Sequence, residues 1–394
     1  MRLTVAPRWI AFSIFTLSST LNFLDRQVLA ALAPQLMTQF DLSKGQYGDL
    51  LSAFSITYAL SAPLLGWFID VVGLTTGSAI LVALWSLAGM STGLAGGYMS
   101  LLLARGALGL VEGGSVPAVG KASALYLKPR ERSIATAINQ VGLTLGAVLA
   151  PLAGQWIATG HGWRWAFYAT GALGFLWIPL WLFTARKIPP PPIPRTARIS
   201  VSQLMSDRRF WLLLAANMAV MVIYSLWVNW TTVYLVSRHG LTQEAANQRL
   251  AWMPQIFGTA GGLFGAWLSL RWLKNSVVRA RLNATLAGCV LALVTALIPL
   301  APSPGWATAG ICASFFACLI ASVNIYAIPL DLFGPERAAF AVAGLTGSYG
   351  LLQTFFSPLT GRIVDHLGFT PVLEACAVLP LLGYLLLWLA ARTE

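Results

Sequence analysis

Two short segments of this chain place ionisable side chains inside long apolar stretches. The first is Asn22-Phe-Leu-Asp25-Arg26, in which Asn22 lies about one helical turn from both charged residues. The second contains Arg105 and Glu112, which are seven residues apart and therefore share one face of a helix, about 10 Å apart along its axis. Because charges are costly in an apolar environment, each of these four is a functional hypothesis.

These four charged groups could carry protons and bind an anion. Their charges sum to zero when all are ionised, and protonation of both carboxylates leaves only the two positive guanidiniums. We therefore predict that Asp25 and Glu112 carry protons, and that Arg26 or Arg105 binds a carboxylate with two hydrogen bonds. Alternatively, the charges form interhelical ion pairs, such as Asp25 with Arg105, that only hold the helices together.

Other polar residues near these segments are further candidates. Gly-Gly-Ser-Val-Pro117 interrupts the helix after Glu112 and could free backbone groups toward the site. Lys121 lies nominally on the opposite face from Glu112 near a membrane surface, so snorkelling competes with substrate binding. For neutral residues in apolar helices, ligand contact and interhelical hydrogen bonding both stay open. The candidate substrate contacts of this kind are Tyr58, Asn22, Gln140, Gln255 and Asn324.

The elements that must position these residues are membrane helices. Of 394 residues, 25 are Lys or Arg and 13 are Asp or Glu, whereas 57% are hydrophobic. A soluble domain carries about 25% charged residues, so that class is excluded. The apolar stretches predict an all-α membrane protein with twelve transmembrane helices. The predicted spans are 9–37, 46–69, 75–97, 99–121, 133–157, 163–184, 210–237, 250–270, 280–300, 305–330, 338–363 and 370–390.

The basic residues predict the orientation of these spans. With the N-terminus inside, seventeen Lys and Arg lie on the inner side and five on the outer side. Cytoplasmic connections carry such an excess, so both termini should be cytoplasmic. The net charge of +12 therefore reflects membrane topology, with the lipid bilayer as partner and no nucleic acid.

The longest connection divides the chain into two six-helix halves. We predict an N-terminal bundle over residues 1–186, a cytoplasmic Pro-rich basic linker over 187–209 and a C-terminal bundle over 210–394. Pro151-Leu-Ala-Gly154 recurs as Pro358-Leu-Thr-Gly361, which suggests inverted three-helix repeats and alternating access. Small residues at close helix contacts could also produce this match.

Several classes of function lack their residues in this sequence. No Gly-Lys-Ser/Thr motif follows a glycine-rich loop, so transport would depend on an ion or substrate gradient. Cys289, Cys312, Cys318 and Cys376 have no CxxC spacing and are expected to be packing residues. We expect no enzyme activity, no metal and no cofactor, with protons as the coupling ion. We also expect a monomer.

Several motifs give the chain a specific resemblance. They are Asn22-Phe-Leu-Asp25-Arg26, the segment from Arg105 to Pro117, Pro129-Arg-Glu-Arg132 and Gly162-Trp-Arg-Trp-Ala-Phe167. These segments resemble the anion:cation symporters of the major facilitator superfamily. Pro117-Ala-Val-Gly-Lys121 and Ser276-Val-Val-Arg-Ala-Arg281 are most similar to the hexuronate and sugar-acid branch.

The resemblance implies bacterial inner-membrane uptake of an organic anion together with protons. It implies proton-carrying roles for Asp25 and Glu112, and substrate roles for Arg26, Tyr58 and Lys121. We therefore expect a proton-coupled symporter of a small organic anion, with hexuronates and other sugar acids first and monocarboxylates second. A proton-driven efflux antiporter is a further alternative, which would favour an aromatic cavity over paired arginines.

Overall fold

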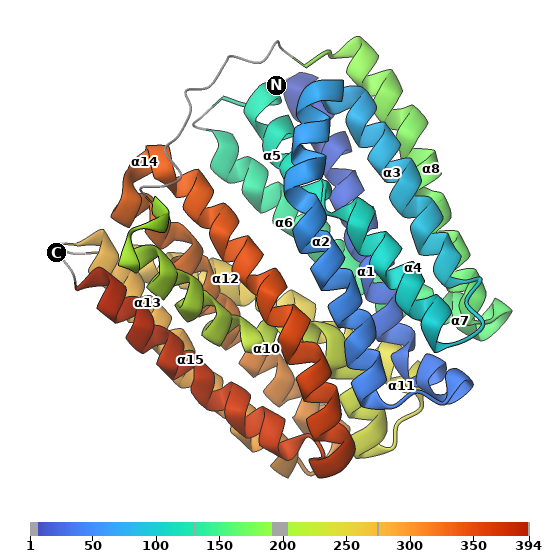
Figure 1. The fold of residues 1–394 in the computed structure, drawn as a ribbon. Helices are drawn as coiled ribbons and strands as arrows, with labels where there is room; N and C mark the ends of the chain where they lie inside the picture. The colour runs from blue at the N-terminus through green and yellow to red at the C-terminus, as the bar shows by residue number, and fades with distance from the viewer. Residues whose placement is uncertain (1–6, 129–130, 191–203, 274–275, 393–394) are drawn as a thin grey trace, which may run out of the picture. The chain divides into compact units, whose positions relative to one another are not determined.

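The computed structural model describes residues 7–128, 131–190, 204–273 and 276–392, and all regular structure in these ranges is helical (Figure 1). The chain divides into two compact units. Unit 1 comprises Met1–Leu42, Asp49–Arg195 and Gln243–Gln248, and unit 2 comprises Ser43–Gly48, Thr196–Thr242 and Arg249–Glu394. The predicted linker at 187–209 lies largely outside the described residues, and the predicted domain boundaries stay a prediction.

Unit 1 contains the helices that carry the charged residues. Its elements are α1 (Pro7–Phe40), most of α2 (Lys44–Val72), α3 (Leu74–Thr92), α4 (Tyr98–Glu112), α5 (Ser115–Tyr126), α6 (Arg132–Leu149), the π-helix η2 (Ala150–Gly154), α7 (Gln155–His161), α8 (Trp163–Lys187) and the short α11 (Gln243–Ala246). Helix α1 packs against α6 and α8, and α3 packs against α4 and α8.

Unit 2 is built around two long helices. Its elements are α10 (Arg208–His239), most of the π-helix η3 (Asn247–Ala251), α12 (Met253–Arg271), α13 (Val277–Leu291), the 3₁₀ helix η4 (Ala292–Leu300), α14 (Pro304–Leu367) and α15 (Thr370–Ala391). Helix α14 packs against α10, α12 and α13, and α10 also packs against α15.

The predicted spans 305–330 and 338–363 belong to one helical element, α14, with no non-helical connection between them. This element turns back on itself, so its two parts correspond to the two predicted spans. Cys318 donates to the carbonyl of Val220, and the carbonyl of Leu345 accepts from Asn217, so both positions contact one turn of α10. A straight helix would separate residues 27 positions apart by about 40 Å.

The described helices have the length and composition of membrane spans. Nine candidate spans occur among the described residues, three of which join consecutive helical elements, as in Tyr98–Tyr126. The three other predicted spans are also helical, and they correspond to α1, α12 and the second part of α14. The all-helical membrane fold is therefore confirmed.

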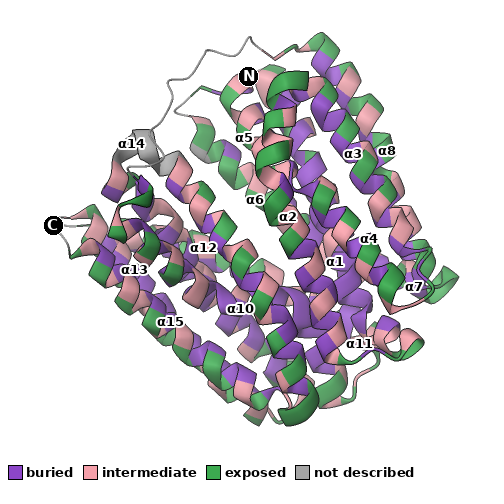
Figure 2. Cartoon of the chain, viewed as in Figure 1, coloured by how far each residue is buried: buried purple, intermediate pink, exposed green. Residues whose placement is uncertain are grey.

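Apolar side chains are exposed in stripes at helical spacing (Figure 2). On α8 the stripe comprises Leu173, Leu176, Leu180 and Phe183, and on α15 it comprises Val378, Leu382, Leu385 and Leu389. Exposed apolar stripes of this length are unfavourable in water and suit contact with lipid chains. These faces account for the low share of charged residues in the sequence.

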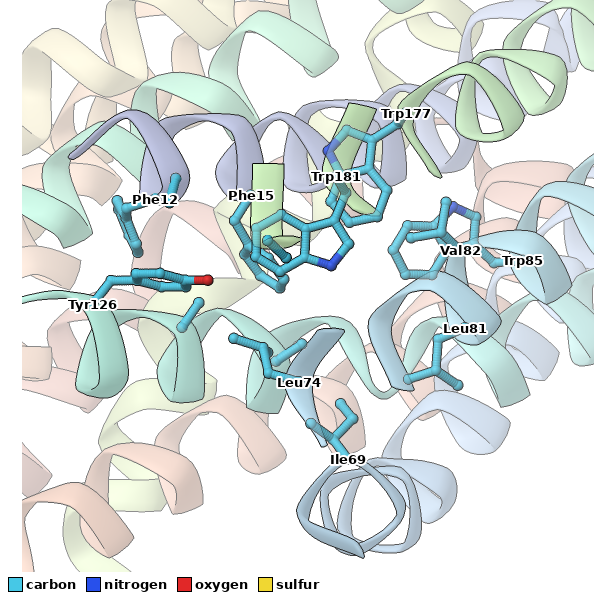
Figure 3. Packing of buried hydrophobic residues seen from close by; sticks show 14 of the residues in the cluster. Phe12, Phe15, Ile69, Leu74, Leu81, Val82, Trp85, Tyr126, Trp177 and Trp181 are labelled. Atoms are coloured by element: carbon cyan, nitrogen blue, oxygen red, sulfur yellow. The ribbon is translucent and has the colours of Figure 1, made fainter. Parts of the chain in front are cut away.

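An aromatic core holds α1 and α8 of unit 1 together (Figure 3). Phe15 meets Trp181 edge to face at 4.9 Å between ring centroids, and Trp177 stacks on Trp181 at 5.7 Å. The indole N–H of Trp177 donates to the carbonyl of Ile14, so this buried polar atom is satisfied. This core anchors the helix that carries Asp25 and Arg26.

Each unit also includes a short segment from elsewhere in the chain, docked beside one copy of the Pro-Leu-x-Gly repeat. In unit 1, the amide of Asn247 donates to the carbonyl of Ala31 and to Gln155, which directly follows η2. In unit 2, Asp365 accepts from the backbone N–H groups of Lys44 and Gly45, four residues beyond the second copy. The first copy is a π-helix and the second is not.

Candidate functional site

Helix α1 supplies three residues of the site from one face. Asn22 and Asp25 are each 3% exposed, and Arg26, one turn beyond Asn22, is partly exposed. The Arg26 guanidinium donates a long hydrogen bond, 3.5 Å, to the side-chain oxygen of Asn22. The spacing of this motif therefore places its polar groups together, as predicted from the sequence.

Two glycines bring α4 into backbone contact with α2. A methyl group built on Gly109 would lie 2.2 Å from the carbonyl oxygen of Phe54, and one built on Gly113 would lie 2.2 Å from the hydroxyl of Ser61. Only glycine allows the two helices to approach this closely. The contact places Glu112, which lies between these glycines, beside the side chains of α2.

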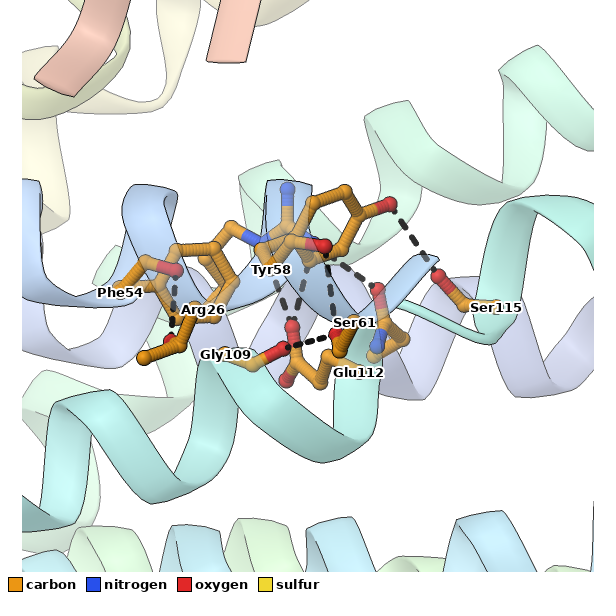
Figure 4. A network of polar contacts seen from close by, with 9 residues as sticks. Arg26, Phe54, Tyr58, Ser61, Gly109, Glu112 and Ser115 are labelled. Carbon is orange, nitrogen blue, oxygen red and sulfur yellow. Dashed lines mark hydrogen bonds and ion pairs between the residues drawn. The ribbon is translucent and has the colours of Figure 1, made fainter. Parts of the chain in front are cut away.

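Arg26 and Glu112 form an ion pair within this contact (Figure 4). Nε and Nη2 of Arg26 donate to Oε2 of Glu112 at 3.3 and 3.1 Å. The Glu112 side chain is fully buried, whereas that of Arg26 is 21% exposed. Oε1 of Glu112 has no hydrogen-bond partner among the described residues. The carboxylate is therefore held by one oxygen, and the guanidinium stays partly accessible.

Aromatic rings surround the guanidinium of Arg26. Its Cζ lies 4.6 Å from the ring centroid of Phe54, 4.9 Å from that of Tyr58 and 5.6 Å from that of Phe23. Cations within about 6 Å of a ring centroid are attracted by the negative face of the ring. The hydroxyl of Tyr58 lies 3.5 Å from that of Ser115, which begins α5 after the Gly-Gly break.

Arg105 and Asp25 complete the charged cluster. Arg105 is 1% exposed, and its Cζ lies 4.9 Å from the centroid of Phe54. Asp25 interacts electrostatically with Glu112, Thr170 and Arg105. Neither of its oxygens meets the geometry of a hydrogen bond to a described residue. Arg26 thus forms an ion pair with Glu112, and Asp25, which was considered as an ion-pair partner of Arg105, interacts with it electrostatically.

Four candidate substrate residues lie outside this cluster. Lys121 donates from Nζ to the carbonyl of Ile69 and to Oδ1 of Asp70, both at 2.8 Å, so its ammonium is bound near the end of α2. Gln140 is exposed on α6. The amide of Asn324 on α14 donates to the carbonyl of Gly265 on α12, which is the interhelical alternative. Gln255 lies half-buried on α12 in unit 2.

Phe54, whose ring lies beside the guanidiniums of both Arg26 and Arg105, was not predicted from the sequence. The signal was present, because Phe54 and Tyr58 are four residues apart and therefore lie on one face of α2. The two rings stack at 5.6 Å with an interplanar angle of 29°. Phe54 was indistinguishable from a lipid-facing or core phenylalanine until its neighbours were known.

The described residues contain no group of three His, Cys, Asp or Glu side chains that could hold a metal ion. What the fold and the site define is a polytopic helical membrane protein with two buried carboxylates and two arginines in one unit. This combination of lipid-facing helices and intramembrane ionisable groups is typical of secondary transporters.

Comparison with known proteins identifies the family. The model of the Major Facilitator Superfamily matches residues 15–345, and the chain belongs to this superfamily. The chain is 30% identical to a hexuronate transporter of Escherichia coli (strain K12), covering all of this chain and 96% of that protein. It is also 30% identical to a galacturonate transporter of Dickeya chrysanthemi, covering 75% of this chain and 92% of the relative.

A probable sulfoacetate transporter of Cupriavidus necator is 26% identical, covering 93% of this chain and 90% of the relative. Among solved structures, a bacterial homologue of the human lysosomal transporter Spinster, in an inward-facing and occupied conformation, superposes with a TM-score of 0.81. The superposition covers 99% of this chain and 98% of the Spinster homologue, and the two sequences are 20% identical. The predicted resemblance to the sugar-acid branch is confirmed by the relatives, and the chain is a transporter rather than an enzyme.

Proposed function

We propose that this protein is a proton-coupled symporter of a small organic anion, with hexuronates and related sugar acids as its substrates, and that it works by alternating access. The observation that carries the proposal is the ion pair between a partly exposed Arg26 and a fully buried Glu112. The names of the hexuronate and galacturonate relatives support the substrate class.

The ion pair gives a physical route to coupling. A guanidinium binds a carboxylate best through two parallel hydrogen bonds, and two of the donors of Arg26 are directed at Glu112. A substrate carboxylate and Glu112 therefore compete for the same group. Protonation of Glu112 removes its negative charge and weakens its hold on Arg26, so an entering anion finds the guanidinium free.

Asp25 provides a second carboxylate for a proton. It is buried, and the groups near it that favour its negative charge are Thr170 and Arg105. A buried carboxylate with few partners favours its neutral form. We propose that Asp25 and Glu112 bind protons before the anion, and that protons are the only coupling ion.

The test is uptake into vesicles that contain only the purified protein. With an acidic exterior, labelled galacturonate should accumulate above equilibrium, and a pH-sensitive dye inside the vesicles should report proton entry only when substrate is present. Glucuronate, galactonate and lactate serve as competitors. Accumulation of labelled lactate but not of labelled galacturonate would favour the monocarboxylate alternative, and proton movement without any organic anion uptake would reject symport.

We propose further that the chain lies in the bacterial inner membrane with both termini in the cytoplasm, as a monomer. The excess of basic residues on one side supports this orientation. The four native cysteines are buried, so single introduced cysteines can be labelled over a low background. An impermeant thiol reagent added outside intact cells should label His161→Cys, at an exposed position, and leave Arg392→Cys unlabelled until the membrane is opened.

A further inference from the structure

Phe54 is a neutral residue at the centre of the charged cluster. Its side chain is 6% exposed, and the guanidiniums of Arg26 and Arg105 lie 4.6 and 4.9 Å from its ring centroid. Both distances fall within the range of cation–π attraction. One phenylalanine thus contacts two cations that belong to different helices, and the coupling route through Glu112 assigns it no role.

When Glu112 is protonated, Arg26 and Arg105 are left as two like charges beside one buried ring. Guanidiniums close together repel each other, and the repulsion grows where water is excluded, because the local dielectric constant falls. The negative face of an aromatic ring attracts each cation without adding a net charge. A carboxylate in the same place would instead bind the arginines and compete with an incoming anion.

The position of this ring is fixed from two sides. The Phe54 carbonyl lies against Gly109, where even a methyl group would be 2.2 Å from the oxygen, so its backbone cannot shift toward α4. Its ring stacks on Tyr58, which also faces Arg26. Phe54 is therefore held rigidly enough to determine where the guanidiniums lie.

We infer that Phe54 is a positioning residue that holds Arg26 and Arg105 in the geometry that receives the substrate carboxylate, an inference that rests on the proposed function. When Glu112 releases Arg26, the guanidinium loses its anionic partner inside the protein. The ring of Phe54 keeps it in place until the substrate carboxylate binds. Phe54 acts through the arginines and makes no polar contact of its own with the substrate.

The test separates the aromatic face from simple apolar packing. Phe54→Leu keeps an apolar side chain but removes the face, whereas Phe54→Tyr keeps it. We expect the dissociation constant of galacturonate, measured by titration calorimetry on purified protein, to rise about 3- to 30-fold in Phe54→Leu. In Phe54→Tyr it should stay within about threefold of the wild type.

Phe15→Leu is the matched control. Phe15 is 1% exposed in the same unit and packs against Trp181, and no cation lies over its ring among the described residues. This variant should melt at a lower temperature with an unchanged dissociation constant. Wild-type affinity in a folded Phe54→Leu variant would overturn the inference, as would a Phe54→Tyr variant that binds as poorly as Phe54→Leu.

A second measurement does not depend on the substrate. In a double-mutant cycle on thermal unfolding, Phe54→Leu and Arg26→Gln should be non-additive because the two side chains touch, whereas Phe15→Leu and Arg26→Gln should be additive. If the wild type binds no organic anion but the first cycle shows coupling, the proposed function fails and the contact of Phe54 with Arg26 stands. Additivity in both cycles overturns the role of Phe54.

Discussion

The two units contain nearly the same aromatic pair in different electrostatic surroundings. In unit 1, Phe54 and Tyr58 stack at 5.6 Å with an interplanar angle of 29°, and in unit 2, Tyr224 and Phe315 stack at 5.3 Å with the same angle. Arg26 lies over both rings of the first pair. The second pair meets the edge of a third aromatic ring, that of Tyr349. A similar aromatic stack therefore packs against a cation in unit 1 and against a further ring in unit 2.

Near this aromatic pair, unit 2 contains neutral polar residues that hydrogen-bond to each other. Ser225 donates to the side-chain oxygen of Gln353 at 2.9 Å, and the indole N–H of Trp227 donates to Ser314 at 2.9 Å. Such hydrogen bonds contribute about 1 kcal/mol each and do not change with proton concentration. The response to protons should consequently reside in unit 1, and the variants below test that division.

The largest effect should come from Glu112→Gln, which resembles the permanently protonated side chain in size and charge. We expect this carrier to bind and exchange substrate but to lose accumulation driven by a proton gradient, because the group can no longer ionise. Uptake should therefore stop at equilibration while counterflow of labelled galacturonate continues. Both activities are measured on one vesicle preparation.

If Glu112 only stabilises the fold, a different pattern of activities is expected. Loss of a buried partner of Arg26 would then destabilise the protein by about 3–5 kcal/mol and abolish both activities together. Glu131→Gln removes a carboxylate that pairs with Arg8 near the ends of α1 and α6, and it is the control that should keep concentrative uptake. Accumulation that survives in Glu112→Gln would leave Asp25 as the coupling carboxylate of unit 1.

Arg26→Lys should have the next largest effect. Lysine keeps the charge but lacks the planar fork, so we expect galacturonate binding to weaken by about 1–3 kcal/mol. The control is Arg281→Lys in unit 2, where Arg281 pairs with Asp331 at 2.8 Å and the affinity should not change. If only the Arg281 variant loses affinity, the assignment of the carboxylate site to unit 1 is wrong.

Glycine contacts test whether helix spacing in unit 1 has a functional role. Gly109→Ala forces a methyl group against the Phe54 carbonyl and should cost about 1–3 kcal/mol of stability, whereas Gly106→Ala meets only a methyl group of Thr57 at 3.8 Å. In unit 2, Gly261→Ala meets the carbonyl of Phe316 at 2.2 Å, and a methyl group on Gly262 meets nothing within 4 Å.

We expect both tight positions to lower the melting temperature and both open ones to leave it nearly unchanged. Only Gly109→Ala should also weaken galacturonate binding beyond what its stability loss explains, because it displaces Phe54 and the arginines above it. Equal loss of affinity in Gly109→Ala and Gly261→Ala would contradict the division between the units.

Most of the fold could be predicted from the sequence, because apolar length alone identifies a membrane helix. The two passes of α14 were predicted as the separate spans 305–330 and 338–363, but the continuous helical backbone between them was not, since Gly334-Pro335 in the sequence favours a break. At the site, Asp25 and Glu112 could be predicted from their residue types alone, because a charged side chain inside the membrane is energetically unfavourable unless it has a function. Their pairing could not be predicted, because it depends on the rotation and approach of α1, α2 and α4, which Gly109 and Gly113 set.

The neutral candidates show the limit of this reasoning. Asn324 is a polar residue in an apolar helix, as Tyr58 is, but Asn324 donates to the carbonyl of Gly265 while Tyr58 faces Arg26. Both are polar residues within apolar spans, so only the neighbouring helix shows which of them belongs to the site and which forms an interhelical hydrogen bond. Phe54 could not be predicted for the same reason, because an apolar side chain is favourable in an apolar span and does not by itself indicate a function.

The smallest effect should come from the surface ion pair of Arg8 with Glu131, at 2.8 Å, outside the membrane-spanning helices. The hydrogen bond from Arg8, followed by that from the backbone N–H of Lys128, lowers the pKa of Glu131 below its ordinary value of 4.5. A carboxyl with a lowered pKa stabilises the folded state above its unfolded pKa, and this contribution disappears as the pH falls through the folded value. Exposed pairs contribute little, so wild type and Glu131→Gln should differ only slightly in melting temperature at pH 7.

The measurement is the melting temperature of both proteins in detergent from pH 7 down to pH 3, at low and high salt. The difference should shrink below about pH 4.5 and with added salt, because the pair is screened as well as titrated. A difference that grew on acidification would mean that Glu131 is more stable protonated in the folded protein, and the ion pair would then not be what holds it.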